Sequence, residues 1–203
     1  MKPRALLDLA TMRDIAKRCR CRVVRVQRWR SRLAGRPGLA YELECPSHAA
    51  KVRLLDGLAW NDAKRDMQLR EVALELAAEA GPSPLARARA IQRFVSLGVD
   101  FAREPREVFQ DAFWTLALGV GDCDDHYRLV AALARAVGLN VRPRTVMSRK
   151  RPGVPTHVAP QFGFPSKAPR RWVWAETTLR AKLGEHPRAA RRRLQARGRA
   201  DIG

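Results

Sequence analysis

A cysteine near the middle of the chain has the surroundings of a reactive thiol. Cys123 follows a glycine turn and begins a strongly patterned helix, which we expect over residues 123–137, before Gly138. A helix N-terminus offers unpaired backbone N–H groups and about half a positive charge, and both favour thiolate over thiol. The position therefore predicts a nucleophile, the alternative being a buried structural thiol.

Two later residues have the types that a cysteine nucleophile requires. Such a nucleophile needs a base to take its proton, and the base needs a third group to orient it. His157 and Glu176 follow Cys123 in that order, within the strand-like segments 156–164 and 171–177. Adjacent antiparallel strands can bring an imidazole and a carboxylate side by side. The sequence thus permits a Cys–His–Glu triad, although each of these residues alone would have an ordinary structural role.

Other residues near the thiol modify this hypothesis. Asp122, Asp124 and Asp125 crowd Cys123 and would raise its pKa, against the effect of the helix terminus. The last two of these aspartates are also common at helix starts. Pro160 cannot donate to a strand ladder, so it predicts an edge strand or a bulge.

An oxyanion on a bound substrate needs hydrogen-bond donors. The backbone N–H of Cys123 would be one, and Trp114 and Gln110 are candidates for a side-chain donor. His126 follows the cysteine motif, but helical periodicity gives it another direction, and we expect it at the surface.

The elements around this site predict an α+β fold preceded by a small basic β meander. Gly81 ends one helix, and Ser83 with Pro84 starts the next. The apolar connection 98–120 is expected to line the approach to Cys123. The other expected elements are a helix over 5–18, strands over 21–29, 39–45, 51–55 and 140–147, helices over 69–80 and 84–95, and a surface helix or tail over 180–200.

A second cluster of potential ligands lies in the meander. Cys19, Cys21, Cys45 and His48 flank its first hairpin, with Cys21 almost opposite Cys45. Four such ligands could hold a structural zinc ion, which would stabilise a module too small for its own core. Reduced thiols are the alternative, since four cysteines in a chain of this size do not indicate a disulfide scaffold. Catalysis by a cysteine triad requires no cofactor.

Charge is unevenly distributed along the 203 residues, which include 40 Lys or Arg and 20 Asp or Glu. Basic ends flank a mildly acidic middle, a pattern that suits a polyanionic neighbour or a solvated surface. We expect a basic module over 1–58, a main domain over 59–180 and a basic helix or tail over 181–203. No signal peptide or membrane span is evident, so we expect synthesis in the cytoplasm and no membrane partner.

The three candidate catalytic residues lie in blocks that resemble the transglutaminase-like superfamily of papain-like thiol enzymes, over roughly residues 66–180. The blocks are Gly121-Asp122-Cys123-Asp124-Asp125, the helix 129–139, Thr156-His157-Val158 and Trp174-Ala175-Glu176-Thr177-Thr178. The cysteine block is similar to versions in bacterial and phage proteins. The resemblance implies a nucleophilic Cys123, a basic His157, an orienting Glu176, and helices that carry the thiol packed on an antiparallel sheet.

The leading hypothesis is a thiol hydrolase that cleaves an amide of a protein or wall peptide through an acyl-enzyme on Cys123. Water as acceptor gives a peptidase or amidase, which the bacterial and phage resemblance favours, and a lysine amine would give a cross-link. The alternative is a non-catalytic structural component of a phage particle or tail. It would retain the fold and bind other phage structural proteins or a polyanion through its basic ends. Virion association would follow from that alternative.

Overall fold

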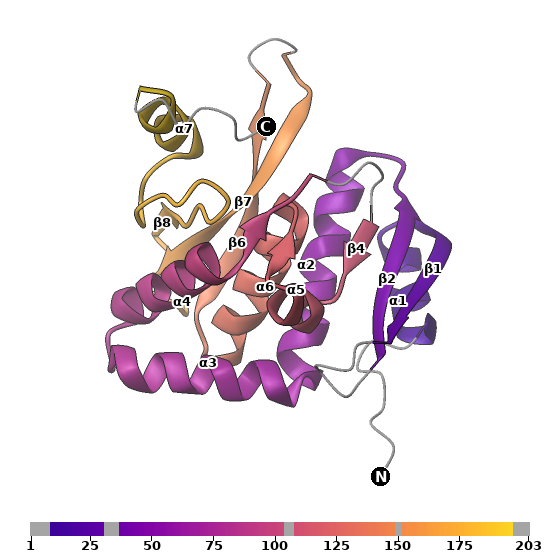
Figure 1. Ribbon diagram of the computed structural model, residues 1–203, viewed down its shortest axis with the longest axis horizontal. Coiled ribbons are helices and arrows are strands. Elements are labelled where there is room, and N and C mark those ends of the chain that lie inside the picture. The colour runs from indigo at the N-terminus through magenta and orange to yellow at the C-terminus, as the bar shows by residue number, and fades with distance from the viewer. Residues whose placement is uncertain (1–8, 31–36, 104–107, 149–151, 197–203) are drawn as a thin grey trace.

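A central helix organises the protein. The computed structural model describes residues 9–30, 37–103, 108–148 and 152–196, and α6 (Cys123–Ala136) lies among its other elements (Figure 1). All of α6 from Asp124 to Ala134 is buried. It is contacted by α2 (His48–Arg65), α3 (Met67–Ala80), α4 (Pro84–Gly98), α5 (Ala112–Leu118) and the sheet that contains β7. A helix enclosed in this way has no polar side that faces solvent, unlike an amphipathic helix at a domain surface.

The polar residues of α6 are instead satisfied by partners inside the fold. Arg128 is fully buried, and its guanidinium bonds both carboxylate oxygens of Asp62 on α2, at 2.6 and 3.0 Å. The same guanidinium donates to the carbonyl of Gln110 at 2.6 Å. A buried charge with this many partners is tolerated, whereas a lone one would be strongly destabilising.

An antiparallel sheet covers one side of α6. Its strands β6 (Asn140–Met147), β7 (Pro155–Phe164) and β8 (Arg171–Trp174) pair in the order β6-β7-β8. The predicted strands are confirmed, but β7 is the middle strand, so the expected edge position of Pro160 is wrong. Gln161 pairs with Trp174, the last residue of β8, and Pro160 precedes Gln161 in β7. The carbonyl of Pro160 still accepts a hydrogen bond from Ala175 N–H at 2.9 Å. The missing N–H therefore falls where the ladder stops.

The predicted helix boundaries around Gly81 are confirmed. Helix α3 ends at Ala80 with Gly81 as its cap, and Gly81 has a φ of 79°, which suits glycine. Ser83 then accepts a hydrogen bond from Ala86 N–H, and Pro84 is the first residue of α4. These caps are local signals, which explains why the sequence reveals them.

The N-terminal region differs from a β meander. Helix α1 (Leu9–Arg18) is followed by the antiparallel strands β1 (Arg22–Arg30) and β2 (Pro37–Glu44), as expected. The predicted third strand over 51–55 is wrong, because these residues lie within α2, which Ser47 caps by accepting from Ala50 N–H. The third strand is β4 (Val108–Gln110), which pairs with β2. The expected boundary at residue 58 thus falls inside a helix, and α1 contributes Met12 and Ile15 to the main core.

The connection over 98–120 has structure of its own. Besides β4 and α5 it contains the short strands β3 (Asp100–Phe101) and β5 (Val120–Gly121), which pair in parallel. The last described element is α7 (Pro187–Ala196), which lies near β8 (Figure 1). In the described ranges, no helix combines the length and apolar character that crossing a membrane requires.

Candidate active site

Cys123 begins α6 at a tightly capped helix start. The side chain of Asp122 accepts from the backbone N–H groups of Asp124 and Asp125, and Asp125 bonds back to the N–H of Asp122. This capping box satisfies the first donors of the helix. Gly121 is required beside it, because a Cβ there would lie 2.8 Å from the Cβ of Asp125. The glycine and the aspartates thus fix where the thiol stands.

The predicted base and orienting group are in direct contact. His157, on β7, has its Nε2 2.6 Å from Oε2 of Glu176, which follows β8 by two residues. The other carboxylate oxygen of Glu176 accepts from both the backbone N–H and the hydroxyl of Thr178, each at 2.7 Å. Gln92 on α4 donates to the Glu176 carbonyl at 2.8 Å. Glu176 is therefore held on three sides, and it fixes the imidazole in turn.

Burial and hydrogen bonds act oppositely on the Glu176 carboxyl, which is fully buried. Burial raises its pKa, but the bond and charge of His157 and the two bonds from Thr178 together hold the pKa below its ordinary value of 4.5. Glu176 is thus ionised at neutral pH, as an orienting carboxylate must be.

Cys123 and His157 line one cleft of about 1110 Å³. The thiol receives a hydrogen bond from the backbone of Val158, the residue after His157, so the start of α6 meets β7 at this point. Phe101 and Phe109, from the connection over 98–120, also line the cleft. The prediction that this connection borders the approach to Cys123 is confirmed for these two aromatic residues.

The thiol itself is not activated by its surroundings. Burial raises the pKa of Cys123 well above its ordinary value of 9.0, and the charges of Asp124 and Asp122 raise it further. The hydrogen bond from Val158 and the charge of Lys51 act in the other direction but do not outweigh these effects. Cys123 is therefore a thiol at neutral pH, chiefly because it is buried, and Asp124 and Asp122 contribute in the expected direction.

Lys51 is a site residue that sequence analysis did not identify. Its ammonium group lies 2.5 Å from Oδ2 of Asp124, and it also lies over the ring of Phe109. The segment of Lys51 was assigned to a strand of a separate module, far in sequence from Cys123, so no local signal indicated this contact. Thr178 and Gln92 were missed for a similar reason, since their roles depend on tertiary contacts.

His126 is not at the surface as predicted. Only 1% of it is exposed, and its Nδ1 lies 3.1 Å from the hydroxyl of Thr177. Burial lowers its pKa to about 4, so the imidazole is neutral at pH 7. The surface prediction assumed that one side of α6 faces water, and no side of this part of the helix does.

The two side chains suggested as oxyanion donors do not reach the cleft. The amide of Gln110 donates to the Asp125 carboxylate at 3.0 Å and to the Val120 carbonyl at 2.9 Å. Trp114 is 3% exposed, and neither residue is among the described residues that line the cleft. The backbone N–H of Cys123 remains as the predicted donor.

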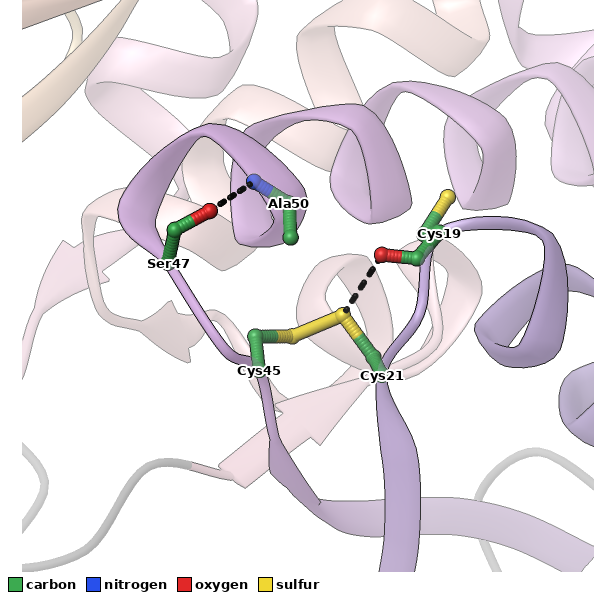
Figure 2. Close-up of a disulfide and its surroundings, with 5 residues drawn as sticks. All are labelled: Cys19, Cys21, Cys45, Ser47 and Ala50. Atoms are coloured by element: carbon green, nitrogen blue, oxygen red, sulfur yellow. Dashed lines mark hydrogen bonds between the residues drawn. A yellow bond between two sulfur atoms is a disulfide. The ribbon is translucent and has the colours of Figure 1, made fainter.

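The proposed zinc ligands adopt a different arrangement. Figure 2 shows Cys21 joined to Cys45 by a disulfide, with Cys19 beside them as a free thiol. Cys21 continues the register in which Arg22 pairs with Glu44, so the two cysteines do face one another as expected. The disulfide uses two of the four ligands, and the described residues contain no group of three or more that could hold a metal ion. A covalent link between Cys21 and Cys45 thus stands in place of the Cys₃His arrangement. It also differs from the alternative, in which all four cysteines are reduced thiols.

Comparison with known families identifies the domain that contains these residues. The family model of the transglutaminase-like superfamily matches residues 70–179, more than half of the chain. The protein therefore belongs to the transglutaminase-like superfamily, and the resemblance noted from its motifs is confirmed at this level. The matched range contains Cys123, His157 and Glu176 and leaves out α1, β1, β2, α2 and α7. Neither a curated protein nor a solved structure matches the sequence.

Proposed function

We propose that this protein is a thiol hydrolase, a peptidase or amidase that acts through an acyl-enzyme on Cys123. The observation that carries the proposal is the contact of His157 with a buried, ionised Glu176, in the same cleft as the thiol at the start of α6. A solvated strand-end carboxylate would not be fully buried or receive two hydrogen bonds from Thr178.

The proposed reaction has two halves. Nε2 of His157 is occupied by Glu176, so Nδ1 is the nitrogen left to take the proton of Cys123 as the sulfur attacks an amide carbonyl. The C–N bond then breaks, and His157 returns the proton to the leaving amine. Water next attacks the thioester, with His157 again as base, and releases the acid and the free thiol. Because the raised pKa keeps Cys123 protonated, proton transfer must accompany the attack rather than precede it.

The first experiment traps the acyl-enzyme. The protein is mixed with a 4-nitrophenyl ester of a short N-acylated peptide, quenched in acid, and mapped by mass spectrometry. We expect an acyl group on Cys123, with Cys19 unmodified because it is buried. His157→Asn should slow nitrophenolate release roughly 100-fold or more, and Cys19→Ser should leave it unchanged. Acylation of Cys123 at the rate of the denatured protein, unaffected by His157→Asn, would contradict the proposal.

One observation favours a second candidate. Burial and the neighbouring aspartates raise the pKa of Cys123, as expected of a protein that keeps the fold without the chemistry. Such a protein would act by binding, as a structural component of a phage particle or tail would. The acylation experiment separates the two, because a binding protein gives no dependence on His157.

A further inference from the structure

The C-terminal helix α7 has two different faces. Arg188, Arg191, Arg192 and Gln195 follow helical spacing of i, i+3, i+4 and i+7, and all four line the cleft of Cys123 and His157. The opposite face carries Ala190 and Leu194, which pack against Leu179 and Ala181. The helix is thus amphipathic, with three of its four arginines on the face that lines the active-site cleft.

Several contacts fix α7 in this position, so of the two expectations for this segment, a surface helix or a tail, the helix is the one observed over 187–196. Arg188 donates to the carbonyl of Met147 at 2.8 Å, so it ties the helix to the end of β6. Arg193 bonds both carboxylate oxygens of Glu185, at 3.0 and 3.1 Å. The ring of His186, just before the helix, lies edge-on to Trp174 of β8 at 4.8 Å. The basic wall therefore belongs to the folded domain.

Acidic residues also line the described part of this cleft, and they have partners in other parts of the fold. Glu44 bonds to Arg22 outside the cleft at 2.6 Å, and Asp122 caps α6. Asp124 is paired with Lys51. The side chains of Arg191 and Arg192 are exposed and line the cleft, so a molecule that enters it can reach both guanidinium groups.

We propose that the arginine face of α7 is a subsite for substrate carboxylates, so that the enzyme selects amides within acidic peptide segments. This inference rests on the proposed function, since the occupant must present an amide to Cys123. Arginine is suited to the role because its planar guanidinium can bond both oxygens of a carboxylate. A polypeptide is favoured over nucleic acid because the same cleft holds the thiol and the imidazole, and the arginine face itself offers no aromatic ring on which a base could stack.

The test measures binding separately from turnover. Cys123→Ala protein is titrated with a fluorescein-labelled peptide rich in Glu and Asp, and with its Gln and Asn counterpart, while anisotropy is recorded. We expect the acidic peptide to bind roughly tenfold more tightly than the amide peptide, with the difference shrinking as salt rises. The double variant R191E/R192E should remove that preference.

A matched control is available on α4. Arg89 and Arg93 are exposed, lie one turn apart and do not line the cleft, so R89E/R93E changes the net charge equally. It should keep the preference within about twofold. Loss of the preference in both double variants would indicate a general charge effect and overturn the subsite. If R191E/R192E does not fold, R192Q is the alternative variant, because it keeps the buried face of α7 intact. It should weaken the preference for the acidic peptide in part. An unchanged preference in R192Q would overturn the proposal.

Two further outcomes are distinguishable. Acylation of Cys123 by the nitrophenyl ester, without any preference for acidic peptides, would contradict the subsite but support the proposed hydrolase. Preferential binding of the acidic peptide, without acylation of Cys123 or cleavage by the wild-type protein, would contradict the proposed hydrolase and support the arginine face as a binding site. If an oligothymidylate binds more tightly than the acidic peptide, and R191E/R192E abolishes that binding, the arginine face is a nucleic-acid site instead.

Discussion

Lys51 and Asp124 form an ion pair that joins α2 to the first turn of α6, with 2.5 Å between Nζ and Oδ2. Asp124 is almost fully buried, and its other carboxylate oxygen lies 3.9 Å from the sulfur of Cys123. The two partners act on the thiol in opposite directions, because Asp124 raises the pKa of Cys123 and Lys51 lowers it. Burial has the larger effect on that pKa, and the ion pair modifies it.

Replacing Asp124 by Asn should make Cys123 more reactive. The substitution removes a negative charge beside the thiol while the positive charge of Lys51 stays, so the pKa of Cys123 should fall. A fall of about one pKa unit corresponds to roughly tenfold more thiolate at about pH 8. The rate of alkylation by iodoacetamide, followed on Cys123 by mass spectrometry, measures this change. Asp14→Asn, at an exposed residue of α1, is the control, and an equal rate in both variants would contradict the assignment.

Thr178 should act as a positioning residue for the base. Thr178→Val removes the hydroxyl that donates to Glu176 at 2.7 Å, and a hydrogen bond to a charged group contributes about 1.5–3 kcal/mol. Thr178 also lowers the pKa of Glu176, so its loss should raise that pKa. We expect acylation of Cys123 to slow roughly tenfold or more and the acid limb of its pH profile to move to higher pH. Thr178→Ser keeps the hydroxyl and should restore both, whereas a loss of rate without the pH shift would indicate only a structural role.

The parts of this fold that were predictable are those with local signals. The caps at Gly81 and Ser83 fix helix ends from a few residues, and the β-branched and aromatic residues over 155–164 and 171–174 indicate strands. A contact between His157 and Glu176 could be predicted because His157 lies in β7 and Glu176 follows β8, the neighbouring strand. Their contact follows from sheet pairing, which sequence order already suggested.

The parts that were not predictable depend on which elements enclose others. Residues 51–55 alternate polar and apolar types as a strand would, but the cap at Ser47 and the packing of α2 against α6 decide for helix. His126 was assigned to the surface because periodicity alone cannot show that helices and a sheet surround α6. The pairing of Lys51 with Asp124 is likewise a tertiary contact. Local periodicity does not indicate such contacts, because they join residues that are far apart in the sequence.

His126 should make the protein sensitive to mild acid. Its pKa is about 4 in the folded protein, below the ordinary value of 6.5, so the unfolded chain binds a proton first as the pH falls. Stability contributed by the neutral imidazole is therefore present above pH 6.5 and lost as the pH approaches 4. Between about pH 6.5 and 4.5 the loss should be roughly 2 kcal/mol in the free energy of unfolding. Urea titrations at the two pH values measure it.

The variant His126→Gln should lose this part of the pH dependence, because glutamine does not titrate. His186→Gln is the comparison, since His186 is exposed and should leave most of the dependence in place. An identical fall in stability for wild type and His126→Gln would show that other groups, such as the carboxylates, account for the acid sensitivity.

The disulfide should stabilise the N-terminal hairpin against unfolding. Cys21 and Cys45 are separated by 24 positions, and closing a loop of that size contributes roughly 3 kcal/mol by the chain-entropy model. Because Cys45 precedes the α2 cap Ser47 and both residues line the cleft, the link also holds that wall of the site. C21A/C45A should lower the free energy of unfolding by about that amount, and Cys19→Ala, at the neighbouring free thiol, should cost less.

The same protein distinguishes the disulfide from the predicted zinc ion. Unfolded without reductant, the wild-type protein should show only the thiols of Cys19 and Cys123 to Ellman's reagent, and elemental analysis should find no bound zinc. If all four cysteines react and zinc is present in equal amount, Cys21 and Cys45 are metal ligands rather than a covalent pair. In that case a chelator, and not a reductant, would release the end of β2 from the start of β1. Disulfides persist in oxidising compartments, so the thiol count also bears on where the protein resides.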